Sequence, residues 1–288
     1  MMRRRSTPGA GRRGIALVAV LWIVAALSIA VTGIVHTIRS ETRTIGASRR
    51  MLDLQAVGEA AIMLALQGMT APPQAGQRVP WRRVDLPYDG RVVTVEVNAL
   101  NGFVDINRAA PELLAALFAV AGGLKGPAAA ALAQATVQAR QQPDATGQPL
   151  RFEAIEDLMR VPGVDYDLYA RLRPLITADA LGSGKVNAQA APQELLAVLA
   201  DGNLARAAAL SNARLQGAPT MDTSTLRTDF IDGGVGTRYR MQAFVPMADG
   251  SLGVVLRTVD LNPDQRAGLP WRIFNAETWM HVPPEKGG

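Results

Sequence analysis

Residues Ile15 to Ile38 read IALVAVLWIVAALSIAVTGIVHTI and contain no Asp, Glu, Lys or Arg. As a helix that rises 1.5 Å per residue, this run covers about 36 Å, enough to cross the roughly 30 Å hydrocarbon core of a bilayer. A secretory signal has a shorter apolar core, of about 7–15 residues, followed by a cleavage site. The run therefore predicts a membrane-spanning helix over 15–38.

Positive charge is concentrated directly before this run. Residues 1–14 contain five arginines and no acid, and without them the 30 Lys and Arg residues of the chain fall to 25, equal to the 25 Asp and Glu. The formal charge of +5 and the pI of about 10.1 thus belong to a short basic leader. By the positive-inside rule, the amino terminus lies in the cytoplasm and the bulk of the chain on the other side of the membrane.

The helical pattern continues beyond the apolar run to about Gly68. Ile38, Ile45, Leu52 and Leu66 keep a seven-residue spacing, which predicts one apolar stripe along a helix. A separate helix after a break at Gly46 is the alternative. The segment 70–76, with two prolines, ends the pattern.

Strand patterns occur in two distant parts of the chain. Residues 91–97 alternate, with valines at 93, 95 and 97, and residues 239–245 alternate in the same way before a turn at Asp249–Gly250 and a return over 252–261. Trp271 to Phe274 adds an edge strand. We interpret Asn101–Gly102 as a hairpin turn between residues 91–97 and 103–106, because Asn-Gly tolerates positive φ. The sequence predicts one antiparallel sheet that is split by an insert.

The insert is predicted to be helical and to contain a repeat. Segments 104–114 and 185–196 share an Asn, then Ala-Ala-Pro and a helix, with Pro111 and Pro192 in the first turn. Residues 152–163 predict a helix closed by Pro162–Gly163. These units resemble helix-hairpin-helix modules, which bind DNA phosphates through a Gly-containing turn. A SAM-like fold that uses the turns only for packing is favoured, because residues 104–199 have little basic excess.

Catalytic chemistry finds little support in the sequence. With no Cys and only His36 and His281, a zinc site would need a carboxylate to reach three ligands. Glycine-rich segments at 182–185 and 233–236 lack the spacing or context of nucleotide-binding loops. We expect no enzyme activity and no cofactor. Six acids could offer oxygens to calcium, though not at EF-hand spacing: Asp222, Asp229, Asp232, Asp249, Asp260 and Asp264.

The amino-terminal residues resemble the type IV prepilin class. The leader ends in Arg-Arg-Gly14, and the apolar run starts at Ile15. The resemblance implies that prepilin peptidase cuts between Gly14 and Ile15 and that the apolar segment stays in the mature protein. Across most of the chain, the order of segments is similar to the K-type minor pseudopilins of the type II secretion system. Most prepilins carry Glu at the fifth position after the cut, whereas Ala19 stands there in this chain, as is typical of the K type.

This resemblance implies an α+β fold with a long amino-terminal transmembrane helix on an antiparallel sheet, interrupted by the SAM-like or helix-hairpin-helix-like insert. The expected segments are a leader (1–14), a membrane span (15–38), a pilin-like helix with first strands (39–104), the insert (105–231) and closing strands with a tail (232–288). A single-pass protein of the inner membrane with a periplasmic bulk is implied. The implied partners are prepilin peptidase and the I- and J-type minor pseudopilins at the pseudopilus tip, without specific nucleic acid. Relatives hold a structural calcium ion, but its ligands cannot be assigned here. The alternative is a membrane-anchored, helix-hairpin-helix DNA receptor.

Overall fold

The computed structural model describes residues 12–72, 77–143, 147–179, 181–218, 221–262 and 268–281. Side chains of residues 12–17, 29–45 and 281 lie outside this description. The chain divides into two compact units, Met1–Asp53 and Leu54–Gly288. Helix α1 (Arg12–Thr70) begins in the first unit and ends in the second, just before the prolines that predicted its end.

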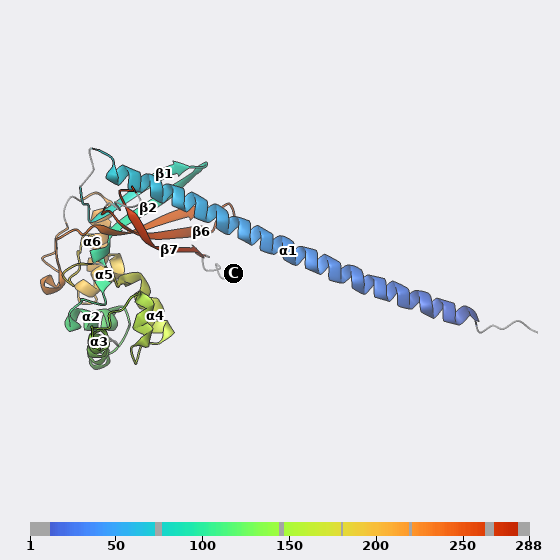
Figure 1. Ribbon diagram of the computed structural model, residues 1–288, viewed down its shortest axis with the longest axis horizontal. Coiled ribbons are helices and arrows are strands. Elements are labelled where there is room, and N and C mark those ends of the chain that lie inside the picture. The colour runs from blue at the N-terminus through green and yellow to red at the C-terminus, as the bar shows by residue number, and fades with distance from the viewer. Residues whose placement is uncertain are drawn as a thin grey trace, which may run out of the picture. The chain divides into compact units, whose positions relative to one another are not determined.

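The second unit is built on an antiparallel sheet (Figure 1). Its described strands are β1 (Trp81–Tyr88), β2 (Arg91–Ala99), β5 (Arg238–Pro246), β6 (Leu252–Asp260) and β7 (Arg272–His281), and they lie in the order β1-β2-β5-β6-β7. Because β2 pairs with β5, the sheet joins two segments that the insert separates in sequence, as the alternation of apolar residues predicted. The expected edge strand at 271–274 is longer than predicted.

The predicted hairpin at Asn101–Gly102 is wrong. The partner of β2 is the preceding strand, β1, and the turn between them is Asp89–Gly90, whose φ angles are +51° and +71°. Asn101 and Gly102 lie in a short 3₁₀ turn, Leu100–Gly102, after which the chain leaves the sheet. Two consecutive residues with positive φ are what a tight two-residue hairpin needs, and Asp-Gly meets that need as well as Asn-Gly does.

The carboxyl-terminal part of α1 packs lengthwise on one face of this sheet (Figure 1). Three valines of β2, at 93, 95 and 97, and the alternate residues of β5 are fully buried beneath it. The buried helix face differs from the predicted seven-residue stripe, because Leu66 is fully buried but Leu52 is 67% exposed. The actual spacing of three and four residues is that of a straight helix on a flat surface. The buried helix residues are Leu54, Val57, Ala61, Ile62, Ala65, Leu66 and Met69.

Two glycines bring the helix and the sheet close together. A Cβ atom at Gly58 of α1 would lie 2.3 Å from Cγ2 of Val255 on β6, and one at Gly253 of β6 would lie 2.2 Å from Cδ1 of Leu54. Next to these contacts, the buried guanidinium of Arg257 on β6 donates to the Glu59 carboxylate of α1. This hydrogen bond holds the pKa of Glu59 below its ordinary value. Close packing and one ion pair therefore fix the register of α1 on the sheet.

The insert forms its own hydrophobic core, separate from the core under α1. It is built from residues between Val104 and Phe230. Its α-helices are α2 (Pro111–Val120), α3 (Gly126–Gln141), α4 (Tyr166–Leu172), α5 (Gln193–Leu199) and α6 (Leu204–Leu215). Short 3₁₀ segments are η1 (Leu100–Gly102), η2 (Ile155–Arg160), η3 (Arg173–Leu175) and η4 (Thr228–Phe230), and β3 (Val104–Asp105) pairs in parallel with β4 (Ile176–Thr177). The molecule is thus a mixed fold in which a helical unit interrupts an antiparallel sheet.

The two repeats adopt the same local structure. Asp105 accepts a hydrogen bond from the backbone N–H of Asn107, at 2.8 Å, and Asn187 accepts one from the N–H of Gln189, at 3.0 Å. Asp105 and Asn187 are therefore the equivalent residues, each forming an Asx turn before a pair of helices. Pro111 is the first residue of α2, whereas Pro192 is the residue before the first turn of α5.

Candidate functional site

The predicted processing site, Gly14–Ile15, lies at the amino-terminal end of α1. Residues 1–11 lie outside the described residues, and Gly14 and Ile15 are described only as part of the α1 backbone. Ala19 is exposed on α1. Large apolar side chains surround it in the described stretch 18–28, including Trp22, which is 75% exposed. Cleavage after Gly14 and the role of Ala19 remain predictions.

Among the described residues, no helix has the length and apolar character needed to cross a bilayer. The predicted span, 15–38, includes positions 15–17 and 29–38, whose side chains lie outside the described residues.

The predicted turn residues Asn101 and Gly102 hold the insert to the sheet. The Asn101 side chain donates to the carbonyl of Gly234, at 2.7 Å, and the backbone carbonyl of Asn101 accepts from the N–H of Asn187, at 2.8 Å. A Cβ at Gly102 would lie 2.5 Å from the Cβ of Ala190. These contacts join three segments: the residues that follow β2, the second repeat, and the residues near Gly234 that lead back to the sheet.

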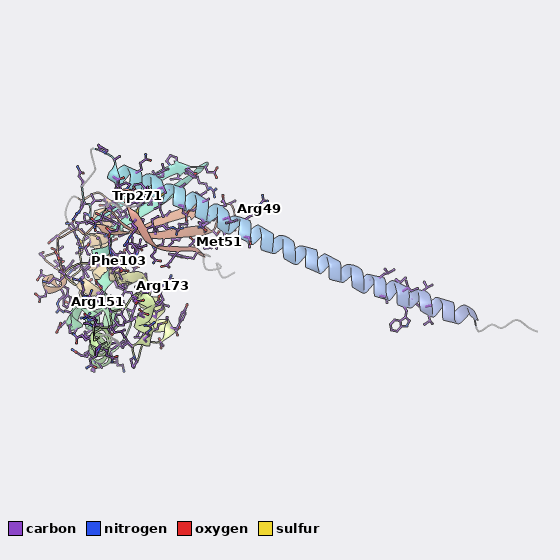
Figure 2. The ribbon with its side chains drawn as sticks, in the orientation of Figure 1. Arg49, Met51, Phe103, Arg151, Arg173 and Trp271 are labelled. Carbon is purple, nitrogen blue, oxygen red and sulfur yellow. The ribbon has the colours of Figure 1, made fainter. Side chains whose placement is uncertain are left out.

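A cleft of about 510 Å³ separates the other face of the sheet from the insert. Residues from both edge strands line it, since Trp81 belongs to β1 and Trp279 to β7. The opposite wall comes from α4 and η3, and from α5 and α6. Figure 2 labels Phe103 and Arg173, which both line this cleft. The cleft therefore crosses the whole width of the sheet.

Arg240 forms part of the cleft lining and is almost fully buried, with 8% of its surface exposed. Its terminal nitrogens donate to the carbonyls of Pro174, at 3.1 Å, and Ile176, at 2.9 Å, and its guanidinium stacks on Phe103 with 3.8 Å to the ring centre. Its Nε has no hydrogen-bond partner among the described residues. Burial lowers the pKa of Arg240 to about 10. Alternation places Arg240 on the face away from α1, but the insert covers that face.

The Gly163 turn does not offer the phosphate site of a DNA-binding module. Gly163 has φ of +98°, a conformation suited to glycine. The following helix, α4, is capped by its own Asp165, whose carboxylate accepts from the N–H of Leu168 at 2.7 Å. Asp157 lies before the turn, within 3.1 Å of Arg160. A phosphate would meet carboxylates at this turn, so the DNA-receptor alternative gains no support.

Four of the six acids considered for calcium are used in turns, and Asp229 lies in η4. Asp222, Asp232, Asp249 and Asp260 each accept the backbone N–H two residues later. Asp264 lies outside the described residues. Across the part of the chain that could be searched, no three His, Cys, Asp or Glu side chains are grouped closely enough to hold a metal ion. A calcium site is not supported by these residues, and the ion remains a prediction without a ligand set.

Comparisons with known proteins were made at three levels. The chain matches no protein-family model and no curated protein. Among solved structures, it is similar to a chain in the crystal structure of the GspK–GspI–GspJ complex from the type 2 secretion system of enterotoxigenic Escherichia coli. The alignment has a TM-score of 0.49 and 14% sequence identity, and covers 83% of this chain and 99% of that one.

Proposed function

We propose that this protein is a minor pseudopilin of the type II secretion system, anchored in the inner membrane by residues 15–38 with its bulk in the periplasm. In this role it assembles with the I- and J-type minor pseudopilins at the pseudopilus tip and supports the export of folded proteins across the outer membrane. The proposal describes a structural component rather than an enzyme.

The observation that carries the proposal is a combination of sequence and fold. In the sequence, a basic leader that ends at Gly14 is followed directly by an apolar segment, and the backbone of that apolar segment is part of α1. The carboxyl-terminal part of α1 then packs along an antiparallel sheet. A filament subunit needs this arrangement, because the apolar part of its helix can pack against other subunits while the sheet forms the head.

Processing provides a direct test. In cells with prepilin peptidase, the mature protein should begin at Ile15, and Gly14→Leu should keep the leader, because the peptidase must fit a small residue beside the cut. Mass spectrometry of the purified protein measures both. Ala16→Leu, on the other side of the cut, is the matched control and should still be processed. A mature wild-type protein that retains Met1, or is cut beyond the span, would contradict the proposal.

Assembly is tested separately by crosslinking and pull-down with the other pseudopilins. The I- and J-type subunits should be recovered with this protein, and the major shaft subunit should not be found above it. A protein labelled at regular intervals along the filament would contradict placement at the tip.

The tip position follows from Ala19. Cleavage creates a new terminal amine in an apolar setting, and an unpaired charge is unfavourable there. In most prepilins a Glu at the fifth position of a neighbouring subunit neutralises this amine, as the resemblance implies. A subunit with Ala19 cannot offer that carboxylate to a subunit nearer the tip. We expect Ala19→Glu to preserve secretion, because it adds a carboxylate without removing a contact.

A further inference from the structure

The cleft between sheet and insert has the dimensions of a peptide site. Its lining reaches from Trp81 on β1 to Trp279 on β7, and so crosses five strands. At about 4.8 Å between neighbouring strands, this width is about 19 Å, the length of about six residues of extended chain at 3.3 Å each. Its volume of about 510 Å³ lies within the usual range of ligand pockets, about 300–1,000 Å³.

Positive charge dominates the lining. Five arginines face three glutamates, and two of those glutamates are already paired, Glu277 with Arg173 and Glu96 with Arg83. The guanidinium groups of Arg171, Arg214 and Arg240 donate to backbone carbonyls and form no direct ion pair with a described carboxylate. Glu96 and Glu277 act on Arg214 and Arg240 only at longer range. A guanidinium group with donors to spare is well matched to a carboxylate.

The two ends of the cleft are alike. At one end Arg214 of α6 lies over the ring of Trp81, 4.8 Å from its centre, and at the other Arg173 of η3 lies 6.0 Å from the centre of Trp279. Each end thus combines a cation from the insert with an aromatic side chain from an edge strand. A ligand that alternates acidic and apolar side chains would pair its carboxylates with the arginines and place its apolar groups on the tryptophans. A small inorganic anion could only do the first.

Arg240 gives the middle of the cleft an unsatisfied group. It is more than nine-tenths buried, its Nε has no partner among the described residues, and its terminal nitrogens donate to carbonyl oxygens beside the Phe103 ring. The Glu277 carboxylate attracts this guanidinium, but Glu277 is already paired with Arg173. A buried charge that shares its one carboxylate with another arginine is only partly compensated, and a second carboxylate brought into the cleft would relieve this.

We propose that this cleft binds an extended, acidic segment of about six residues from a partner polypeptide. The sheet face and the insert form its two walls, so carboxylates can meet the arginines while alternate apolar side chains contact Trp81, Trp279 and Leu256. The cleft is a site on the periplasmic head and does not depend on the leader or the membrane segment.

Fluorescence anisotropy with the full chain in detergent micelles tests the proposal. The probe is a labelled, terminally blocked peptide of three Glu-Val pairs, compared with peptides of three Gln-Val and three Lys-Val pairs. The acidic peptide should bind, the neutral one should bind about tenfold more weakly, and the basic one should not bind. Equal binding of all three peptides, or no binding of the acidic one, would overturn the proposal.

Variants locate the site. Gln242→Glu places a carboxylate on the sheet wall of the cleft, where it should weaken binding of the acidic peptide about tenfold by competing for the arginines. Gln134→Glu, the same change on an exposed position of α3, should leave binding unchanged. Arg173→Gln is a second variant for the same binding measurement if Gln242→Glu lowers the thermal stability. It should also weaken binding of the acidic peptide.

Unchanged binding in folded Arg173→Gln and Gln242→Glu proteins would exclude the cleft. Competition by inorganic sulfate as effective as that by unlabelled acidic peptide would mean an anion site only, and would also overturn the proposal. Neither measurement requires peptidase cleavage or another pseudopilin, so a negative result would leave the proposed secretion role intact.

Discussion

Replacing Gly58 by alanine tests how closely α1 packs on the sheet. The added Cβ would lie 2.3 Å from Cγ2 and 2.7 Å from Cβ of Val255, whereas ordinary contact begins at about 3.4 Å. Val255 cannot move aside easily, because it is fully buried on a central strand. Overpacking of this kind costs about 1–3 kcal/mol, and alanine recovers about 0.5–1 kcal/mol of helix propensity. The expected net loss is about 0.5–2 kcal/mol.

Thermal unfolding followed by circular dichroism measures this loss. For a unit of this size, 1 kcal/mol shifts the Tm by about 2–4 °C, so Gly58→Ala should lower it by about 1–8 °C. Gly68→Ala is the matched control in the same helix, because a Cβ there meets nothing within 4 Å, and it should not destabilise. Val255→Ala should partly relieve Gly58→Ala, so the double variant should lose less than the sum of the single ones. A Gly58→Ala protein as stable as Gly68→Ala would refute the close packing.

Three further predictions concern other parts of the second unit. Gly163→Ala should lower the Tm by the equivalent of about 1 kcal/mol, because φ is +98° there; an unchanged Tm would show that the turn is unconstrained. Gly102→Ala should destabilise by about 1–3 kcal/mol through contact with Ala190, while Gly126→Ala, which meets nothing within 4 Å, serves as its control in chemical denaturation. Because Arg257 lowers the pKa of Glu59, the ion pair stabilises the fold at neutral pH, and this contribution is lost as pH falls from the unfolded-state pKa, about 4.3, through the lower folded-state value. Glu59→Gln should therefore reduce stability by about 1 kcal/mol at pH 7, and its difference from the wild type should shrink below pH 4; a pH-independent difference would contradict the ion pair.

Strands β2 and β5 could be predicted from sequence. The valines at 93, 95 and 97 alternate because one face of β2 meets α1, and the same holds for β5. Strand β1 gave no such pattern, since it is an edge strand with most side chains exposed, and Pro87 is tolerated at an edge. Without a visible β1, the sequence pattern favours Asn101–Gly102 as the hairpin turn next to β2, whereas the structure has that turn at Asp89–Gly90.

The cleft could not be predicted because its walls are far apart in sequence. The alternation of β5 places Arg240 on the face opposite the buried residues Tyr239 and Met241, and the sequence does not indicate what covers that face. Only the tertiary fold brings Pro174 and Ile176 of the insert over it. The leader at 1–14 and Ala19, by contrast, were recognised from sequence, and their roles remain predictions.

The split sheet has a consequence for the order of folding. Strands β2 and β5 can pair only after the two ends of the intervening segment have come close together. The hydrogen bond from Asn101 to Gly234 at this point joins residues 133 positions apart. Closing a flexible loop of that length costs about 4 kcal/mol of chain entropy. The helix pairs α2–α3 and α5–α6 rely on contacts close in sequence, which form quickly. We expect the insert to collapse first and to bring both strands to each other, so that a slow-folding insert would delay formation of the entire sheet.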